Sequence, residues 1–462
     1  MDKGLTLNEK SFKVTVNDVA LAEKDYELTT TTDGFDLKLT WGDGKTRIAD
    51  EALNKGSVAV TYTATLNSQA ELGKAGNVNR VKLIYSSNPK VDKDGKPVNE
   101  PKETPEDAVI AFTYKVDVNK VDEAGESLPG AAFTLTKVTK AGNVVVGTYK
   151  ADGKTSTFSF RGLDDGDYIL TETAVPAGYR PIEPIRFTVE AIHAETWDGS
   201  EGTRRSVLTG LTGDVEDGAI ELTADKDLTT LTGDVENTPS TPPTVEKKIK
   251  DTNDTTGAAS GWQDSADYDI GDEVPFQLKA TLADNVTDYL TYYVTFRDTM
   301  EKGLTFDSIT RVTVNGAETK DYELTGKDNG FDLTLNWGDG KAKIADAKLN
   351  KAVVVVEYIA TLNSDAVLGK TGNVNKVKLI YNDNPSVGQD GKPVDEPKES
   401  PEDAVIAFTY KVEIDKVNQD GEPLSGAEFK LEKLVKGGGK KTIATVKSDK
   451  GTVFTFTGLD DG

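Results

Sequence analysis

The stretch YILTETAVPAGY (168–179) decides how the rest of this sequence is interpreted. It predicts one short strand over residues 168–173, followed by a Pro-Ala-Gly turn that ends at Tyr179. Side chains alternate between the two faces of a strand, so Glu172 shares a face with Tyr168 and Leu170. A carboxylate facing an apolar layer is costly unless it is paired or protonated. We therefore expect Glu172 to have a partner or a proton inside a core.

The composition indicates a string of β domains. The chain has 462 residues, enough for about three to four ordinary domains. It contains 43 glycines and 17 prolines, and Val, Thr, Tyr and Phe are prominent. Helical periodicity is scarce, so we expect an all-β protein of several tandem sandwiches. The net charge of −24 argues against nucleic acid and anionic membranes as partners, and solubility is its simplest explanation.

The sequence offers little for metal or acid–base chemistry. Cysteine is absent and His193 is the only histidine, which argues against a histidine metal site and against a Ser-His-Asp triad. Asp92, Asp94 and Gly95 begin like a calcium loop, but the later ligands are missing, so a plain turn is expected. Trp41 and Trp337 each precede Gly-Asp-Gly and are expected to pack on turns. We expect no cofactor, no metal and no enzyme with turnover.

The chain repeats itself at an offset of 296 residues, as from Trp41 to Trp337. WGDGK, PEDAVIAFTYKV and GLDDG each occur twice, and MDKGLTL at the start corresponds to MEKGLTF at 300–306. Both ends stop inside a repeat, and neither a signal peptide, a sorting signal nor a membrane-spanning run is visible. We interpret the sequence as a window from a tandem array, truncated at both ends.

The repeat and the spacing of turn signals predict four domains. Their expected bounds are 1–109, 110–238, 239–405 and 406–462, of which the first and last are incomplete. The proline-rich TPSTPP (238–243) is expected to be a stiff, short connection. AFTYKV runs without a linker from one domain into the next, which favours a rod-like array. Residues 191–236 contain the near-duplicates LTGDVED and LTGDVEN, which we interpret as a hairpin insertion.

Two separated motifs resemble collagen-adhesin B-type (Cna-B) domains, the small β-sandwiches of Gram-positive pilins and adhesins. They are YKVDVNKVDEAGESLPGAAFTL (114–135) and FSFRGLDDGDYILTETAVPAGY (158–179). The resemblance covers most of residues 110–238. It implies that a lysine of the opening strand bonds covalently to an asparagine of the last strand, and that a buried glutamate catalyses the reaction.

The domain at 239–405 resembles the isopeptide-forming middle domain of fimbrial shaft subunits. The matching segments are PTVEKKIKD (243–251), YYVTFRDTMEKGLTF (292–306) and GNVNKVKLIYNDNP (372–385). Together the two resemblances imply a cell-wall-attached, extracellular stalk with Cna-type sandwiches. Its partners would be other pilin or adhesin subunits, or repeats of the same parent chain, with host ligands as a further possibility and no membrane insertion in this segment.

Strand parity places the candidate cross-link residues on core faces. Lys120 shares a face with Tyr114, Val116 and Val118, whereas Lys247 shares one with Val245 and Ile249. On the partner strands, Asn237 lies on the face of Val235, and Asn375 lies on the face of Val377. With the acids that the resemblance implies, two trios emerge, each joining a first strand to a last strand: Lys120, Glu172 and Asn237, and Lys247, Asp298 and Asn375.

Simpler explanations stay open for both trios. A solvated lysine, a buried salt bridge and a turn asparagine would account for the same residues. Asp298 in particular is followed by Thr299, and Asp-Thr is ordinary turn chemistry. The repeat also supplies unpaired counterparts, Asn79 in the first domain and Lys416 in the last, where we expect no bond.

Three functions compete for this sequence. The first is a structural pilin or adhesin stalk whose complete domains carry self-formed Lys–Asn isopeptide bonds, with Glu172 and Asp298 as the autocatalytic acids. The second is an adhesin region that binds a host glycan or matrix protein. The third is an accessory region of a hydrolase, which the lack of a His/Cys/Asp cluster disfavours.

Overall fold

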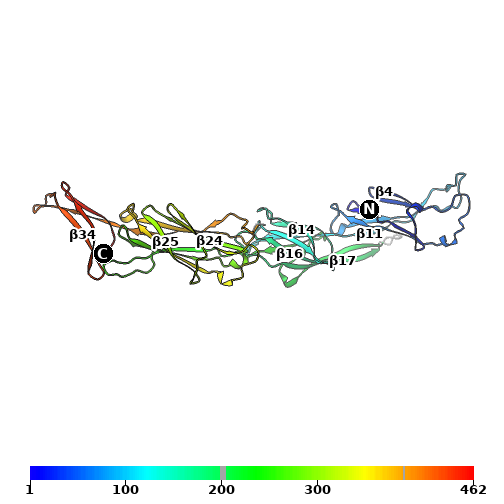
Figure 1. The fold of residues 1–462 in the computed structure, drawn as a ribbon. Coiled ribbons are helices and arrows are strands. Elements are labelled where there is room, and N and C mark those ends of the chain that lie inside the picture. The colour runs from blue at the N-terminus through cyan, green and yellow to red at the C-terminus, as the bar shows by residue number, and fades with distance from the viewer. Residues whose placement is uncertain (198–203, 389–390, 462) are drawn as a thin grey trace. The chain divides into compact units, whose positions relative to one another are not determined.

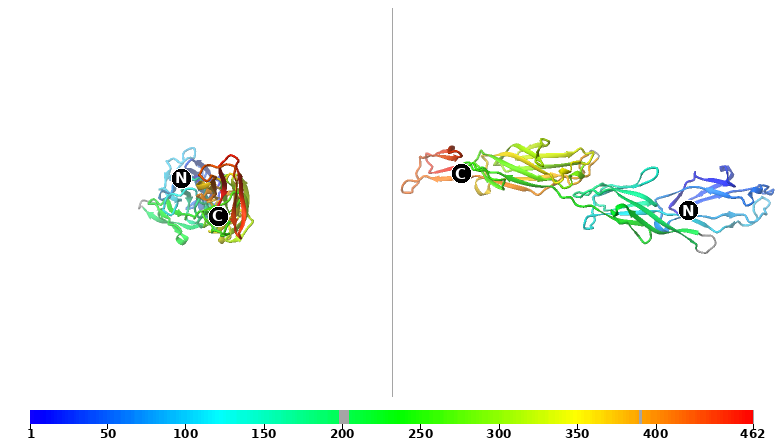
Figure 2. Two further views of the ribbon diagram at one scale, coloured as in Figure 1. Left: turned by 90° about the vertical axis from the view of Figure 1, so that its left-hand side faces the viewer. Right: turned by 90° about the horizontal axis from the view of Figure 1, so that it is seen from below.

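A computed structural model describes the backbone of residues 1–197, 204–388 and 391–461. Side chains are described for the same residues except 195–197 and 204–206. The chain divides into two compact units, Met1–Ala174 with Ile182–Glu236, and Val175–Pro181 with Asn237–Gly462. Almost every element is a strand (Figures 1 and 2), which confirms the expected all-β fold. The remaining elements are single 3-10 turns: η1 (Glu23–Asp25), η2 (Glu51–Leu53), η3 (Gly73–Ala75), η4 (Glu216–Gly218), η5 (Val286–Asp288), η6 (Ala347–Leu349) and η7 (Gly369–Thr371).

The second unit contains a two-sheet sandwich. One sheet has the order β21 (Thr244–Ile249), β23 (Glu273–Thr281), β29 (Val353–Leu362), β25 (Leu304–Val314) and β26 (Ala317–Glu318). The other runs β22 (Ser265–Asp267), β32 (Asp403–Phe408), β30 (Asn373–Tyr381), β24 (Thr291–Met300), β28 (Gly330–Gly338) and β27 (Glu323–Lys327), with β31 (Lys398–Glu399) on β30. Alternating burial is clearest in β29, where half-buried and buried residues follow one another over its whole length.

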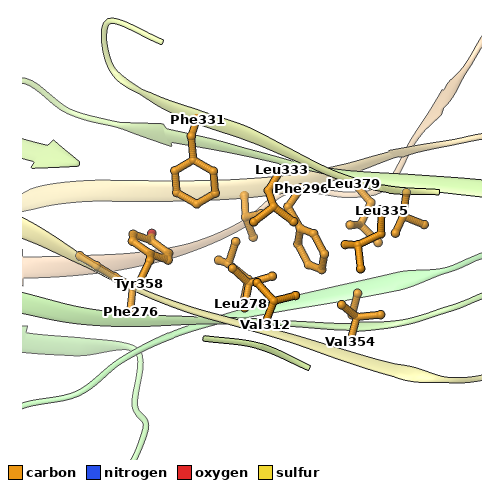
Figure 3. Close-up of a cluster of buried hydrophobic side chains, with 14 of the residues drawn as sticks. Phe276, Leu278, Phe296, Val312, Phe331, Leu333, Leu335, Val354, Tyr358 and Leu379 are labelled. Atoms are coloured by element: carbon orange, nitrogen blue, oxygen red, sulfur yellow. The ribbon is translucent and has the colours of Figure 1, made fainter. Parts of the chain in front are cut away.

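The core of this sandwich changes character along its length (Figure 3). Phe276, Phe331 and Tyr358 gather at one end, and Leu335 and Val354 lie toward the other. Phe276 stacks on Tyr358 with ring centroids 5.2 Å apart, and Phe331 meets the same tyrosine edge-on at 5.0 Å. The aromatic end therefore packs two apolar rings against the ring of Tyr358.

The register between β24 and β30 brings two polar residues to one face of a sheet. Asp298 lies opposite Val377, and Met300 lies opposite Asn375, in an antiparallel pairing. Asp298 and Asn375 are thus diagonal neighbours on the same face, within reach of each other's surroundings. The chain continues from β30 through β31 and β32, so the expectation that Asn375 sits on a last strand is wrong; two further strands follow it.

The remaining strands of the second unit form two antiparallel pairs. β33 (Tyr410–Asp415) pairs with β36 (Val453–Leu459), and β34 (Glu428–Val435) pairs with β35 (Gly439–Lys447). Phe454 and Phe456 of β36 are buried, with Phe429 edge-on to Phe454 at 4.8 Å. The alternating pattern therefore builds a small core here as well.

The first unit contains a second sandwich. One sheet has the order β15 (Thr157–Leu163), β12 (Tyr114–Val121), β20 (Thr230–Glu236) and β19 (Thr223–Ala224). The other runs β14 (Val144–Tyr149), β13 (Ala132–Lys137), β16 (Gly166–Ala174), β17 (Ile185–Trp197) and β18 (Arg204–Val215). β12 and β20, its first and last strands, run parallel side by side, with Lys120 opposite Val235.

The segment 191–236 differs from the expected insertion. The long hairpin joins β17 to β18, and residues 198–203 lie outside the described residues. Of the two near-duplicates, LTGDVED ends β18 and enters η4, whereas LTGDVEN forms β20 in the other sheet. The expectation of one inserted hairpin is therefore wrong, because the second duplicate is a core strand of the sandwich.

The rest of the first unit consists of small sheets. They are β1 (Leu5–Leu7) with β7 (Ala64–Leu66), β3 (Val19–Ala20) with β2 (Lys13–Val16) and β6 (Val58–Thr61), β4 (Glu27–Thr31) with β5 (Gly34–Lys38), β11 (Asp107–Ala111) with β8 (Asn77–Val81), and β10 (Lys102–Glu103) with β9 (Ile84–Tyr85). The division into four domains stays a prediction, and its boundaries at 109/110 and 405/406 fall inside β11 and β32.

The repeat supplies a test of this core with its own control. Leu379 is fully buried, whereas its repeat equivalent Leu83 is 62% exposed. Leu379→Ala should lower the free energy of unfolding of its sandwich by about 2–5 kcal/mol, because it leaves a cavity. Leu83→Ala should change stability by less than about 0.5 kcal/mol. Denaturant titration of the purified chain measures both; equal losses would contradict the placement of Leu379 in the core.

Candidate functional site

A lysine is buried in the sandwich of the second unit. The side chain of Lys247 on β21 has no exposed surface, and that of Asp298 on β24 is buried as completely. The two form a direct ion pair. The Lys247 main-chain NH donates to Asp403 Oδ2 at 2.7 Å, which fixes β21 against the first residue of β32. Strand parity predicts this burial, and the pairing brings together two of the three expected residues.

Tyr358 connects the whole cluster. Its hydroxyl accepts a hydrogen bond from Lys247 Nζ at 2.7 Å and another from Asn375 Nδ2 at 2.8 Å. The same hydroxyl donates to Asp298 Oδ2 at 2.9 Å. Tyr358 belongs to β29 of the first sheet, whereas Asp298 and Asn375 belong to the facing sheet. The cluster therefore spans the sandwich, with one phenol oxygen at its centre.

Sequence reasoning did not single out Tyr358, although two signals point to it. It stands on the inward face of β29 with Val356 and Ala360, where every other member is apolar. Its repeat equivalent is Tyr62, in a segment of matching pattern. A polar aromatic retained on an otherwise apolar face in both copies calls for a buried partner.

Burial shifts the pKa values of this cluster in opposite directions. Desolvation lowers the pKa of Lys247 to about 8, and the attraction of Asp298 opposes that change. Desolvation also raises the pKa of Asp298, against the pull of the lysine charge. The Tyr358 pKa is raised well above its usual value, chiefly by burial and then by Asp298. The environment thus favours a neutral amine, a neutral acid and a neutral phenol.

Two oxygen atoms of the cluster lack hydrogen-bond donors. Asp298 Oδ1 and Asn375 Oδ1 are both buried without a partner in the part of the chain that the structure describes. An unmade hydrogen bond in a core costs about 1–3 kcal/mol. A proton on Asp298 would turn one of these acceptors into a donor, as the raised pKa of this carboxyl allows.

The first unit buries a second lysine. Lys120 at the end of β12 has no exposed surface, and its Nζ donates to the main-chain oxygens of Val121 and Val235 at 2.9 and 2.8 Å. Burial lowers the pKa of Lys120 to about 8, and the charge of Glu172 is the largest opposing influence. Tyr114, Val116 and Val118 share its buried face, as strand parity predicts.

The other two residues of the first expected trio, Glu172 and Asn237, each make a hydrogen bond to the main chain. Glu172, in β16, is half-buried, and its Oε2 accepts from the main-chain NH of Ile182 at 3.2 Å. Asn237 follows β20 directly and is fully buried, with Nδ2 donating to Arg180 O at 2.8 Å. Glu172 was expected to face the core, and it does so only in part: Tyr168 and Leu170 of β16 are buried, whereas Glu172 is half-buried.

The expected unpaired residues are also placed. Asn79 is half-buried and donates from Nδ2 to the Tyr62 hydroxyl at 2.7 Å. Lys416 is half-buried, and its Nζ donates to Val417 O at 2.8 Å. The tyrosine–asparagine contact thus recurs in the first copy.

The weaker candidates make contacts with neighbouring turns and rings. Asp92 Oδ1 accepts from the main-chain NH groups of Asp94 and Lys96 at 2.8 and 2.9 Å, the geometry of an Asx turn. His193 packs against Phe112 with ring centroids 5.1 Å apart. Trp337 is half-buried near Tyr292, and Trp41 is 43% exposed.

Comparison with known proteins gives this site its context. Residues 114–200 and 410–462 match the family model of the SpaA prealbumin-like fold domain, and residues 270–385 match that of the Gram-positive pilin backbone subunit 2, Cna-B-like domain. These segments are Gram-positive pilin-type domains. The resemblance inferred from the sequence motifs is thereby confirmed.

A curated protein matches part of this chain at low identity. The trypsin-resistant surface T6 protein of Streptococcus pyogenes serotype M6 is 27% identical over 204 residues, which cover 40% of this chain and 36% of that protein. The chain therefore spans little more than a third of the curated relative's length.

Solved pilin structures also align with this chain. The major pilin BcpA of Bacillus cereus is 20% identical, with a TM-score of 0.36 over 75% of this chain and 85% of that one. The T6 backbone pilin of S. pyogenes is 19% identical, with a TM-score of 0.38 over 76% of this chain and 75% of that one.

No helix among the described residues is long and apolar enough to cross a membrane.

The depressed pKa of Lys247 predicts how stability depends on pH. Burial lowers the pKa of the folded Lys247 to about 8 from its ordinary value of 10.5, and Asn375→Ala, which has no amide to attack, keeps this amine free to titrate. Between these values the unfolded state binds more protons, so the free energy of unfolding should rise with pH, by about 3 kcal/mol in all.

The matched control is Asn375→Ala combined with Lys247→Met, which removes only the titrating amine. Denaturant titrations of both variants from about pH 7 to 11, a range that includes both pKa values of Lys247, give the difference in the free energy of unfolding at each pH. A pH-independent difference would show that Lys247 keeps an ordinary pKa in the folded chain.

Proposed function

We propose that this chain is part of the shaft of a Gram-positive pilus or adhesin stalk, and that its two complete sandwiches are each locked by a self-formed Lys–Asn isopeptide bond. The proposed pairs are Lys120 with Asn237 and Lys247 with Asn375. The observation that carries the proposal is the fully buried cluster of Lys247, Asp298 and Asn375. The pilin-type domain matches support the stalk role, rather than host-ligand binding.

The chemistry of the proposed bond needs a neutral nucleophile and a polarised amide. Desolvation supplies the first, because it lowers the pKa of Lys247 to about 8. A protonated Asp298 supplies the second by donating a hydrogen bond to Asn375 Oδ1, and its pKa is raised in the same direction. Nζ then attacks Cγ of Asn375, the amide nitrogen leaves as ammonia, and an amide joins the two side chains.

Positioning contributes most of the remaining rate. The folded sandwich holds amine and amide around one hydroxyl, at 2.7 and 2.8 Å from it. Orientation of this kind removes roughly 7–11 kcal/mol of entropic barrier in well-aligned systems. The proposed reaction occurs once in each of the two complete sandwiches, so the chain would be a substrate of its own fold and not an enzyme with turnover.

The bonds would stabilise the two sandwiches in different ways. Closing a loop of about 100 residues constrains the unfolded chain by ~4.7 kcal/mol in the entropy model. The bond of Lys120 would join the end of β12 to Asn237, the residue that directly follows the neighbouring parallel strand β20. The bond of Lys247 would cross from β21 in one sheet to β30 in the other, and β31 and β32 would stay outside the covalent loop.

The proposed stalk role also implies where the protein is located and which partners it has. We propose an extracellular position on the cell wall, with other pilin subunits or further repeats as neighbours. The four-domain division and the lack of a bond at Asn79 and Lys416 belong to the same proposal.

Intact-mass measurement tests the proposed bonds. The purified chain should weigh less than its sequence by two molecules of ammonia, because each bond releases one. Glu172→Ala and Asp298→Ala should each restore one ammonia mass, and the double variant both. As matched controls, Glu190→Ala and Asp332→Ala remove carboxylates of neighbouring strands and should leave both losses in place. An unmodified wild-type mass would refute the proposal.

A further inference from the structure

We propose that Tyr358 is a catalytic proton relay for the Lys247–Asn375 bond, carrying a proton from the attacking amine to the departing amide nitrogen. This inference rests on the proposed cross-link and deepens it. Its basis is geometric: one hydroxyl touches the nucleophile at 2.7 Å and the leaving nitrogen at 2.8 Å. Among the hydrogen bonds of the cluster in the described residues, Tyr358 is the group that reaches all three of the other members.

The reaction itself requires exactly one such transfer. The neutral Lys247 amine has two protons and ends as an amide nitrogen with one. The Asn375 amide nitrogen starts with two protons and leaves as ammonia with three. One proton must therefore move from Nζ to Nδ2, and the hydroxyl oxygen that both atoms contact is the shortest available path.

The relay balances without any outside group. Nζ attacks Cγ, the C–N bond forms, and the carbonyl electron pair moves onto Oδ1, which accepts a hydrogen bond from protonated Asp298. Nζ gives its extra proton to the Tyr358 oxygen while Tyr358 gives its own proton to Nδ2. The carbonyl re-forms, ammonia departs, and both Tyr358 and Asp298 end in their starting protonation states.

The hydrogen-bond directions suit this sequence of events. In the resting cluster Nδ2 donates to Tyr358, because an amide nitrogen lone pair is delocalised into its carbonyl. Attack at Cγ localises that lone pair, so Nδ2 becomes an acceptor at the same 2.8 Å position. The Tyr358 proton, which points to Asp298 Oδ2 at rest, is freed to turn when Asp298 itself carries a proton.

Two independent features support a role built into the fold. The contact recurs in the first copy, where the Tyr62 hydroxyl accepts from Asn79 Nδ2 at 2.7 Å. Burial keeps Tyr358 a neutral phenol, which a relay requires since it must have a proton to give. Lys120, in contrast, donates to main-chain oxygens, so the two proposed bonds differ in what surrounds the amine.

The test follows both bonds in one chain. The full-length wild type, Tyr358→Phe and the control Tyr292→Phe are made by cell-free synthesis, quenched at intervals, and digested for mass spectrometry of the two cross-linked peptides. Tyr292 is an equally buried tyrosine of the same sandwich, whose hydroxyl accepts from the Ala283 main-chain NH. It therefore reports the cost of deleting any buried hydroxyl.

Tyr358→Phe should slow formation of the Lys247–Asn375 peptide by about 100-fold, the usual size of a general acid–base contribution. It should leave the Lys120–Asn237 peptide at the wild-type rate, and Tyr292→Phe should match wild type for both. An unchanged rate in Tyr358→Phe would overturn the relay while leaving the cross-link intact. Absence of the Lys247–Asn375 peptide from wild type would instead overturn the proposed bond and the relay together.

A second measurement tests the relay without removing the hydroxyl, in case the Tyr358→Phe chain does not fold. Replacing tyrosine by 3-fluorotyrosine keeps the hydroxyl and the ring but lowers the phenol pKa. The pH profile for the Lys247–Asn375 peptide should then shift toward lower pH, while that for Lys120–Asn237 stays in place. Superimposable profiles for the first peptide would refute the relay.

Discussion

The structure depends on keeping a lysine amine out of water beside a carboxyl group. A buried charge is expensive, and a buried ion pair recovers that cost only when its geometry and hydrogen bonds are good. In the sandwich of the second unit, Lys247 and Asp298 pair directly and Tyr358 hydrogen-bonds to both, but Asp298 Oδ1 stays without a donor among the described residues. The same desolvation that makes the ion pair costly makes its neutral form, an amine beside an acid, accessible.

This constraint explains why the polar residues sit where they do. Lys247 on the edge strand β21 and Tyr358 on β29 belong to one sheet, whereas Asp298 and Asn375 are diagonal neighbours on the facing sheet. No short segment could bring them together, so the cluster forms only when both sheets have paired in register. A one-residue slip of β30 would turn Asn375 to the opposite face. The proposed cross-linking chemistry would thereby be coupled to correct folding.

The sequence predicted the all-β fold, the repeat and the burial of Lys120, Lys247, Asn237 and Asn375, because period-two alternation states which face a residue occupies. It did not predict Tyr358, since a tyrosine among valines looks like any core aromatic until its hydroxyl partners are known. It misplaced Asn375 on a last strand and LTGDVEN in an insertion. Both errors concern strand order, which depends on long-range pairing and leaves no local pattern.

The most direct test of the central claim is the electron density between Lys247 and Asn375 in a crystal of the purified chain. The account predicts continuous density from Nζ to Cγ, with the asparagine amide nitrogen gone and Tyr358 beside the new bond. Two separate side chains with a clear gap between them, or a solvent-exposed Lys247, would contradict it.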